Sequence, residues 1–237
     1  MTFLALRFAL VLAVLVPLLI LLRPPAPRSR AEWGHLVVVG FLLQAVYFGF
    51  TYLSITSGLS AGTLALIVSL QPILVGLLAS PMAGERVSGG RWAGLGLGLL
   101  GAAVVILARS AVEVTSVVAL LCAAGALAGM TAGTLYEKRF GVEGHPLTTN
   151  LVQYSVGLVA ILPVALALED LRVDWTSDLL LSLAYLVIGN SLISITLLLA
   201  MIRRGEASQV SALFFLVPPL AALIAWPLLG DAVPPLA

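Results

Sequence analysis

Charge is the property that this sequence has least of. Only 10% of its 237 residues are Asp, Glu, Lys or Arg, whereas an ordinary soluble domain carries about 25%. At the same time 61% of the residues are hydrophobic, so there is too little polar surface to cover a water-facing globule. The composition therefore excludes a soluble globular domain and indicates an integral membrane protein.

Cysteine, histidine and any excess of one charge are also scarce. The net charge is +1, so no basic field exists that would hold a nucleic acid. The single cysteine, Cys122, cannot form an intrachain disulfide, and the two histidines, His35 and His145, are not at metal-ligand spacing with a carboxylate or thiol. No motif combines an acid, a base and a nucleophile. We therefore expect no enzyme active site, metal, cofactor or nucleic-acid partner.

Long apolar stretches take the place of these features. A bilayer core about 30 Å thick requires roughly 20 apolar residues per helix, and the stretches lack the strict alternation of barrel strands. The sequence thus predicts an all-α, polytopic membrane helix bundle with eight transmembrane helices, at residues 3–22, 33–55, 60–81, 88–107, 117–136, 148–168, 179–202 and 207–229.

Basic residues gather in every second loop of this bundle. The loops after the second, fourth and sixth spans hold only Arg109 and Arg172. The loops after the first, third, fifth and seventh spans hold Arg23, Arg28, Arg30, Arg86, Lys138, Arg139, Arg203 and Arg204. Short loops rich in Lys and Arg stay cytoplasmic, so we expect a multi-pass protein of the bacterial inner (plasma) membrane with both ends of this chain outside. A cleaved signal peptide fits less well, because the segment RPPAPRSRA lacks a cleavage site.

The two halves of the sequence align without a gap at a shift of 146 residues. The shift pairs Pro17 with Pro163, Pro72 with Pro218, Pro81 with Pro227, and Glu85 with Asp231. It moves each span by five helices, and an odd step inverts the second copy in the membrane. We therefore predict a five-plus-five inverted repeat. Residues 1–108 would form a first repeat lacking its first helix, and residues 109–237 a second repeat lacking its last helix.

Several stretches of the sequence together carry a family pattern. They are LRF in the first span, YFGFTYLSITSGLSAGTLALIVSLQPILVGLL, GERVSGGRWAGLGLGLLG, GTLYEKRF and GEASQVSALFFLVPPLAALIAWPLLGD. Across essentially its whole length the chain resembles the EamA-like branch of the drug/metabolite transporter superfamily. The resemblance implies ten helices, a central cavity, alternating access and, commonly, export of amino acids or related metabolites. The chain departs from the pattern at the absent first helix and at Asp231, where the family usually has Glu.

Polar side chains inside the apolar spans are the candidate substrate-binding groups, because they are costly in lipid and face the bundle interior or a cavity. Gln44 lies mid-span, and the 146-residue shift maps it onto Asn190. Tyr47 and Ser194 share helical faces with Gln44 and Asn190, respectively. A carboxamide donates and accepts, which suits an ammonium and a carboxylate alike. The alternative is that these groups only bond neighbouring helices.

A second candidate set lies beside prolines. Gln71 precedes Pro72, and Ser211 lies shortly before Pro218. A proline removes one backbone donor and frees the carbonyl four residues earlier, so these positions either expose polar backbone to a cavity or simply kink a helix. The spacing of Gly125, Gly129 and Gly133 predicts close helix packing.

Charged groups are expected only at the edges of the spans. We expect Arg7 to reach water from the membrane edge, and no Asp or Glu lies in the core of any span. The predicted cavity is therefore neutral, which favours a small neutral or zwitterionic substrate. The expected partners are this substrate, the lipid bilayer and, as one assembly, a second copy in a homodimer.

The sequence thus predicts a permease that exports amino acids or related small metabolites by alternating access. A lipid or lipid-linked sugar flippase is one alternative. A fragment or assembly partner that does not itself transport is another, because the repeat predicts two helices that this chain does not contain.

Overall fold

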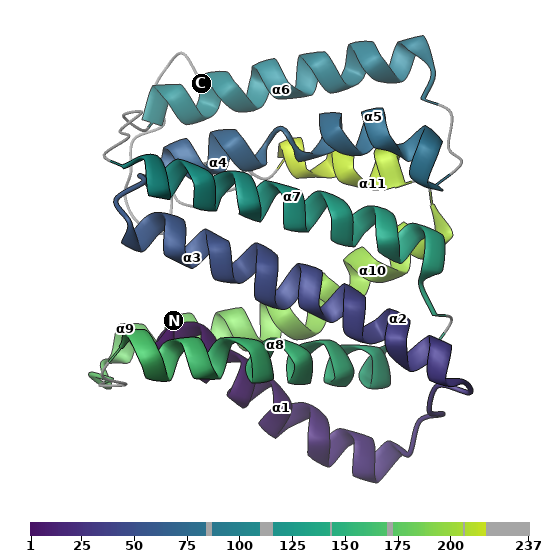
Figure 1. Cartoon of the computed structure of the whole chain (residues 1–237), viewed down its shortest axis with the longest axis vertical. Helices are drawn as coiled ribbons and strands as arrows, with labels where there is room; N and C mark the ends of the chain where they lie inside the picture. The colour runs from purple at the N-terminus through teal and green to yellow at the C-terminus, as the bar shows by residue number, and fades with distance from the viewer. Residues whose placement is uncertain (84–86, 110–115, 143, 170–172, 206, 217–237) are drawn as a thin grey trace.

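The described part of the chain is entirely helical in the computed structural model (Figure 1). The structure describes residues 1–83, 87–109, 116–142, 144–169, 173–205 and 207–216. Within these ranges no residue forms a strand, which confirms the predicted all-α class.

The first half contains four helical spans. They are α1 (Thr2–Leu22); a continuous helix made of α2 (Arg30–Gly40), the π-helical segment η1 (Phe41–Tyr47) and α3 (Phe48–Thr56); the pair α4 (Ala61–Val68) and α5 (Gln71–Ala83); and α6 (Gly89–Arg109). Ser29 and Ser60 begin α2 and α4, because their hydroxyls accept hydrogen bonds from the backbone N–H groups of Glu32 and Thr63. The third span is broken between α4 and α5, directly before Pro72, rather than gently kinked.

The second half also has four helical segments within the described residues. It contains α7 (Val117–Phe140); α8 (Pro146–Leu168); a continuous helix made of α9 (Ser177–Ala184), the π-helical segment η2 (Tyr185–Ser194) and α10 (Ile195–Arg204); and α11 (Ala207–Ala212) with the 3₁₀ turn η3 (Leu213–Leu216). The predicted span 207–229 extends beyond the described residues, and Pro218 lies outside them.

Six of the described helices are long and apolar enough to cross a membrane. They are Thr2–Leu22, Arg30–Thr56, Ala61–Ala79, Val117–Phe140, Pro146–Leu168 and Ser177–Leu198. Polar or charged residues would be too costly along most of their length in lipid, and these sequences avoid them. Length and composition therefore support a polytopic membrane helix bundle.

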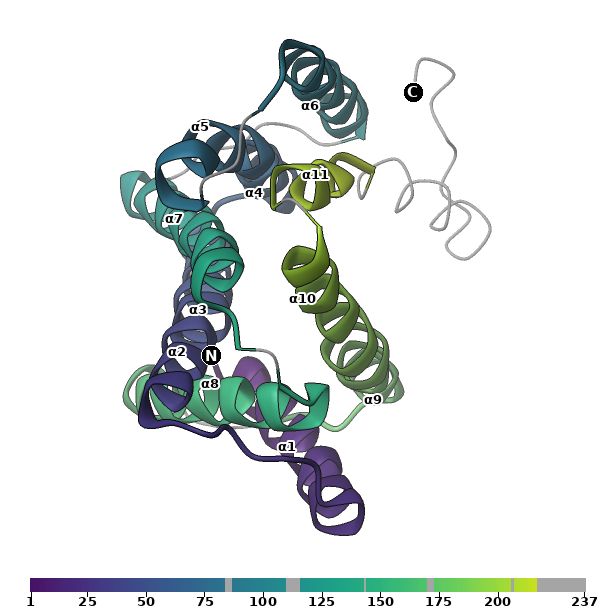
Figure 2. The same cartoon turned by 90° about the vertical axis from the view of Figure 1, so that its right-hand side faces the viewer.

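The helices are arranged as two sides joined at both ends. In Figure 2 the helix α2–η1–α3 and α7 form one side, and α9–η2–α10 forms the other. At one end α1 and α8 pack against each other, and α8 also contacts α2 and η1. At the opposite end α5 packs on α7 and α11. The connections α1–α2, α7–α8 and α10–α11 lie on the right of Figure 1, so the described basic loops share one side of the bundle.

The 146-residue shift relates described helices closely. It carries α1 to residues 148–168 and therefore onto α8, and it places η1 at residues 187–193, inside η2. Phe8 and Tyr154 occupy equivalent positions, and their rings touch edge to face with centroids 5.5 Å apart.

The glycine spacing in α7 creates a close helix contact. A Cβ atom at Gly133 would lie 2.5 Å from the Leu43 side chain, and one at Gly129 would lie 2.6 Å from the Val46 side chain. These approaches allow α7 to pack directly on η1 and α3. The prediction of close packing along this face is therefore confirmed.

Candidate functional site

Both predicted carboxamides lie in π-helical segments. Gln44 lies in η1 and Asn190 in η2, at positions related by the 146-residue shift. π-helical turns make up well under 1% of residues in globular proteins and occur frequently at functional sites. A π-helical turn also changes which residues share a face. Gln44 is fully buried whereas Tyr47 is only half-buried, so the shared α-helical face predicted for them does not describe this segment.

Asn190 and Ser194 likewise differ in their surroundings. Asn190 is half-buried, whereas the Ser194 side chain is exposed. The Ser194 hydroxyl donates to the Gly189 carbonyl 2.9 Å away, five residues earlier in the same helix. This bond follows the wider turn of η2 and fixes Ser194 to its own backbone.

Two glycines enclose two glutamines where α8 meets α2 and η1. A Cβ atom at Gly157 would lie 2.7 Å from the Cβ of Gln44, and one at Gly40 would lie 2.7 Å from the Cα of Gln153. The absence of side chains lets the backbones approach, and both glutamines have 0% exposure. Among the described residues, neither carboxamide has a hydrogen-bond partner for its oxygen or nitrogen. Each unsatisfied buried polar group costs about 1–3 kcal/mol.

Arg7 is buried in the same region, which corrects the expectation that it reaches water. Only 1% of Arg7 is exposed. Its Nε and Nη2 donate to the Ser191 hydroxyl at 3.0 and 2.9 Å, and its guanidinium carbon lies 4.6 Å from the centroid of the Phe48 ring. The reason is the packing of α1 against α8 and η2, which turns this face of α1 toward the bundle interior.

Tyr154 completes this region. Its hydroxyl donates to the carbonyl of Ser191 at 3.3 Å, the same residue whose hydroxyl accepts from Arg7. We name Arg7, Gln44, Gln153, Tyr154 and Ser191 the central polar cluster. It joins α1, η1, α8 and η2. Sequence reasoning did not place Ser191 or Arg7 there, although an arginine within an apolar helix was a usable signal.

The second candidate set forms a separate cluster. Gln71 is fully buried, and its amide nitrogen donates to the hydroxyls of Thr134 at 3.3 Å and Ser211 at 3.2 Å. The structure thus brings Gln71 and Ser211 together across 140 residues of sequence. Thr134 was not foreseen, and it also donates to the Met130 carbonyl at 2.9 Å. We name Gln71, Thr134 and Ser211 the second polar cluster.

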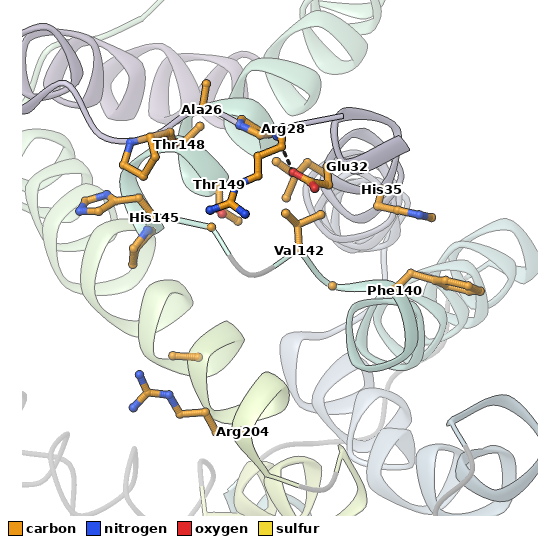
Figure 3. Close-up of a pocket in the computed structure, with 17 residues that line it drawn as sticks. Ala26, Arg28, Glu32, His35, Phe140, Val142, His145, Thr148, Thr149 and Arg204 are labelled. Carbon is orange, nitrogen blue, oxygen red and sulfur yellow. Dashed lines mark hydrogen bonds between the residues drawn. The ribbon is translucent and has the colours of Figure 1, made fainter. Parts of the chain in front are cut away.

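A cavity of about 850 Å³ lies where the α1–α2 and α7–α8 connections meet the end of α10 (Figure 3). Arg28 and Arg204 line it from opposite sides, and His145 and Thr149 line it from the start of α8. Thr149 is buried, and its hydroxyl has no hydrogen-bond partner among the described residues. Gln153 follows four residues later, on the same face and about 6 Å further along α8. Thr149 therefore places its hydroxyl, which lacks a partner among the described residues, one helical turn from Gln153 of the central polar cluster.

These features define the class of the protein. It is a polytopic membrane helix bundle that encloses buried polar groups without a hydrogen-bond partner among the described residues. Within the described ranges, no group of three or more His, Cys, Asp or Glu residues is placed to hold a metal ion.

Comparison with known families then identifies the particular group. The model of the EamA-like transporter family matches residues 1–107 and 117–236. The chain therefore belongs to the EamA-like transporter family. Members of this family are transporters rather than enzymes, and the sequence resemblance described above is confirmed.

Individual relatives match at low identity. The transporter YvbV of Bacillus subtilis is 27% identical over 81% of this chain and 62% of its own length. A "Probable terminal-alkyne amino-acid exporter" of Streptantibioticus cattleyicolor is 28% identical over 75% of this chain and 59% of its own length. A "Probable amino-acid metabolite efflux pump" of Salmonella typhimurium is 25% identical over 87% of this chain and 72% of its own length. The chain thus spans about three fifths of the first two relatives.

A solved structure shares the fold. One crystal structure superposes on 99% of this chain and 81% of its own chain with a TM-score of 0.80, at 21% sequence identity. At this identity the likeness concerns the fold alone.

Proposed function

We propose that this chain forms a membrane permease that exports amino acids or related small metabolites by alternating access. The observation that carries the proposal is the pair Gln44 and Asn190. They occupy repeat-equivalent positions, and each lies in a π-helical segment near the middle of its span. Membrane transporters place substrate sites near the midplane, between repeats, where helices depart from regular geometry. The names of the relatives as exporters and efflux pumps support the direction of transport.

The proposed substrate site is centred on Gln44, Tyr47 and Asn190. The unpaired carboxamide of Gln44 would bind substrate groups, and Ser194 would hold the π-helical turn that carries Asn190. Gln71 and Ser211 form a second polar position further along the bundle, where the Gln71 oxygen still lacks a partner among the described residues. This site would favour small neutral or zwitterionic substrates.

The described conformation suits an inward-open or occluded stage of the cycle. The central polar cluster is closed, because Arg7 and Gln44 are buried. The cavity lies on the side that carries the basic loops, which the positive-inside rule assigns to the cytoplasm. Substrate would enter the cavity past Arg28 and Arg204 and reach the cluster along Thr149 and Gln153. We place the protein in the bacterial inner membrane, as a monomer or a homodimer.

The test is efflux from bacterial cells. Cells lacking their own amino-acid exporters would be preloaded with each of a panel of labelled amino acids, and retention would be compared with and without the chain. The chain would be expressed alone and in a version extended by its flanking coding sequence. We expect faster efflux of a subset of amino acids, abolished in a double variant with Gln44→Leu and Asn190→Leu. Unchanged retention for both versions, at verified expression in the membrane, would contradict the proposal.

A further inference from the structure

Arg7 is a buried cation that is not paired with a carboxylate of the described residues. Its hydrogen-bond partner is the neutral hydroxyl of Ser191, and its other close neighbour is the face of the Phe48 ring. A charged side chain inside a membrane protein is costly unless it is paired, so such residues usually mark a substrate or ion pathway.

The Arg7 guanidinium directs two N–H donors at one oxygen. Arginine presents five N–H groups in a planar fork. Two of them, on Nε and Nη2, are shared with the single Ser191 oxygen. One neutral oxygen therefore stands where a carboxylate would supply two oxygens, one to each of these N–H groups. No carboxylate of the described residues pairs with the guanidinium.

The charge is also unique to one half of the repeat. The 146-residue shift maps Arg7 onto Gln153, which is equally buried but neutral. The central polar cluster thus holds one positive charge and two neutral carboxamides. A ligand carrying one negative charge complements this set better than an uncharged ligand or a polyanion does.

We propose that Arg7 is a substrate-binding residue that pairs with a single carboxylate of the exported molecule. The inference rests on the proposed function and narrows its substrate class to monocarboxylates, including zwitterionic amino acids. The Arg7 guanidinium lies against the ring of Phe48, one helical turn from Gln44, so the carboxylate and a neighbouring polar group of one small molecule can be bound together. Entry of the carboxylate would replace the shared Ser191 bond as the main partner of the guanidinium.

The test compares acids with their amides on the purified full chain in lipid nanodiscs. Equilibrium binding would be measured by calorimetry for the common amino acids and for the primary amide of each. The two molecules have nearly the same size but differ in the charge that Arg7 would recognise. We expect the acid of at least one pair to bind about tenfold or more tightly than its amide. Equal binding of acid and amide, or no binding of any acid in the panel, would overturn the inference.

The variants assign the preference to Arg7. R7Q is expected to weaken binding of the acid about tenfold while leaving the amide within about twofold. R23Q is the matched control, because Arg23 is an exposed arginine at the other end of the same helix, and it should leave the acid-to-amide ratio unchanged. If R7Q does not fold, R7K serves instead and should reduce the ratio by removing the planar fork. A ratio that survives in the folded Arg7 variant would overturn the inference.

Efflux measured in parallel separates this inference from the proposed function. Binding with a clear acid preference but without efflux would retain the role of Arg7 and refute the permease. Efflux of amino acids and their amides at equal rates would retain the permease and refute the role of Arg7.

Discussion

Two buried glutamines in the apolar spans have opposite surroundings. Gln44 and Gln71 are both 0% exposed, and both attract attention in the sequence for the same reason. The amide nitrogen of Gln71 has two hydroxyl partners, on Thr134 and Ser211. The carboxamide of Gln44 has none among the described residues, whereas only the oxygen of Gln71 lacks one. The residue type of a polar side chain in a membrane helix therefore does not distinguish a structural role from a binding role. Its hydrogen-bond partners do.

The difference has an energetic meaning. The hydrogen bonds of Gln71 each contribute about 0.5–1.5 kcal/mol to stability, whereas the unsatisfied groups of Gln44 each cost about 1–3 kcal/mol. A buried group that costs stability is expected where function requires it. We therefore expect the second polar cluster to contribute more to bundle stability than the central polar cluster does, and the central polar cluster to contribute more to substrate binding. Four substitutions test this expectation.

The largest effect is expected from breaking the helix contact that encloses Gln44 and Gln153. Gly40→Ala places a methyl group 2.7 Å from the backbone of Gln153, and α8 must shift to accept it. We expect a loss of about 1–3 kcal/mol in stability, measured by thermal unfolding in detergent, together with loss of efflux. Gly34→Ala in the same helix is the control, because nothing lies within 4 Å of its Cβ position. Equal behaviour of the two variants would show that the contact is not tight.

Replacing Gln44 should separate function from stability. Gln44→Leu removes an unpaired buried carboxamide and keeps an apolar side chain of similar size. We expect efflux to fall about tenfold or more, since a lost hydrogen bond to a charged substrate group is worth about 1.5–3 kcal/mol. The unfolding temperature should stay constant or rise. A drop in unfolding temperature with normal efflux would reverse the assignment of the two glutamines.

Gln71→Leu should show the opposite pattern at a smaller magnitude. The variant removes two hydrogen bonds but leaves Thr134 bonded to the Met130 carbonyl. We expect a loss of about 1–2 kcal/mol in stability and a decrease in efflux of only severalfold. A double-mutant cycle with Ser211→Ala checks the cause. If Gln71 and Ser211 are hydrogen-bonded, the stability lost in the double variant should be less than the sum of the stability lost in the two single variants.

The sequence predicted the helices better than the contacts between them. Apolar runs predicted both ends of α1 and α8 to within two residues and the start of α7 at its residue, because length and hydrophobicity alone define a membrane span. The end of α7 lies four residues beyond the prediction. The position of Gln44 against Gly157 was not predictable, since it depends on how α8 approaches η1. Arg7 was misjudged for the same reason. Distance from a helix end suggested access to water, whereas the packing of α1 against α8 and η2 buries that face.

The π-helical segments were the other feature that helical spacing could not reveal, and Ser194 shows the consequence. An i, i+4 rule places Ser194 beside Asn190 as a second ligand, but in η2 its hydroxyl donates to the Gly189 carbonyl and the side chain is exposed. Ser194→Ala should therefore have the smallest effect, with efflux within about twofold and stability within about 1 kcal/mol of the original. Asn190→Leu, measured in the same efflux assay, should abolish transport. If Ser194→Ala lowers efflux as much as Asn190→Leu does, Ser194 contacts substrate directly in another stage of the transport cycle. In that stage Asn190 and Ser194 would share one face, as α-helical spacing predicts.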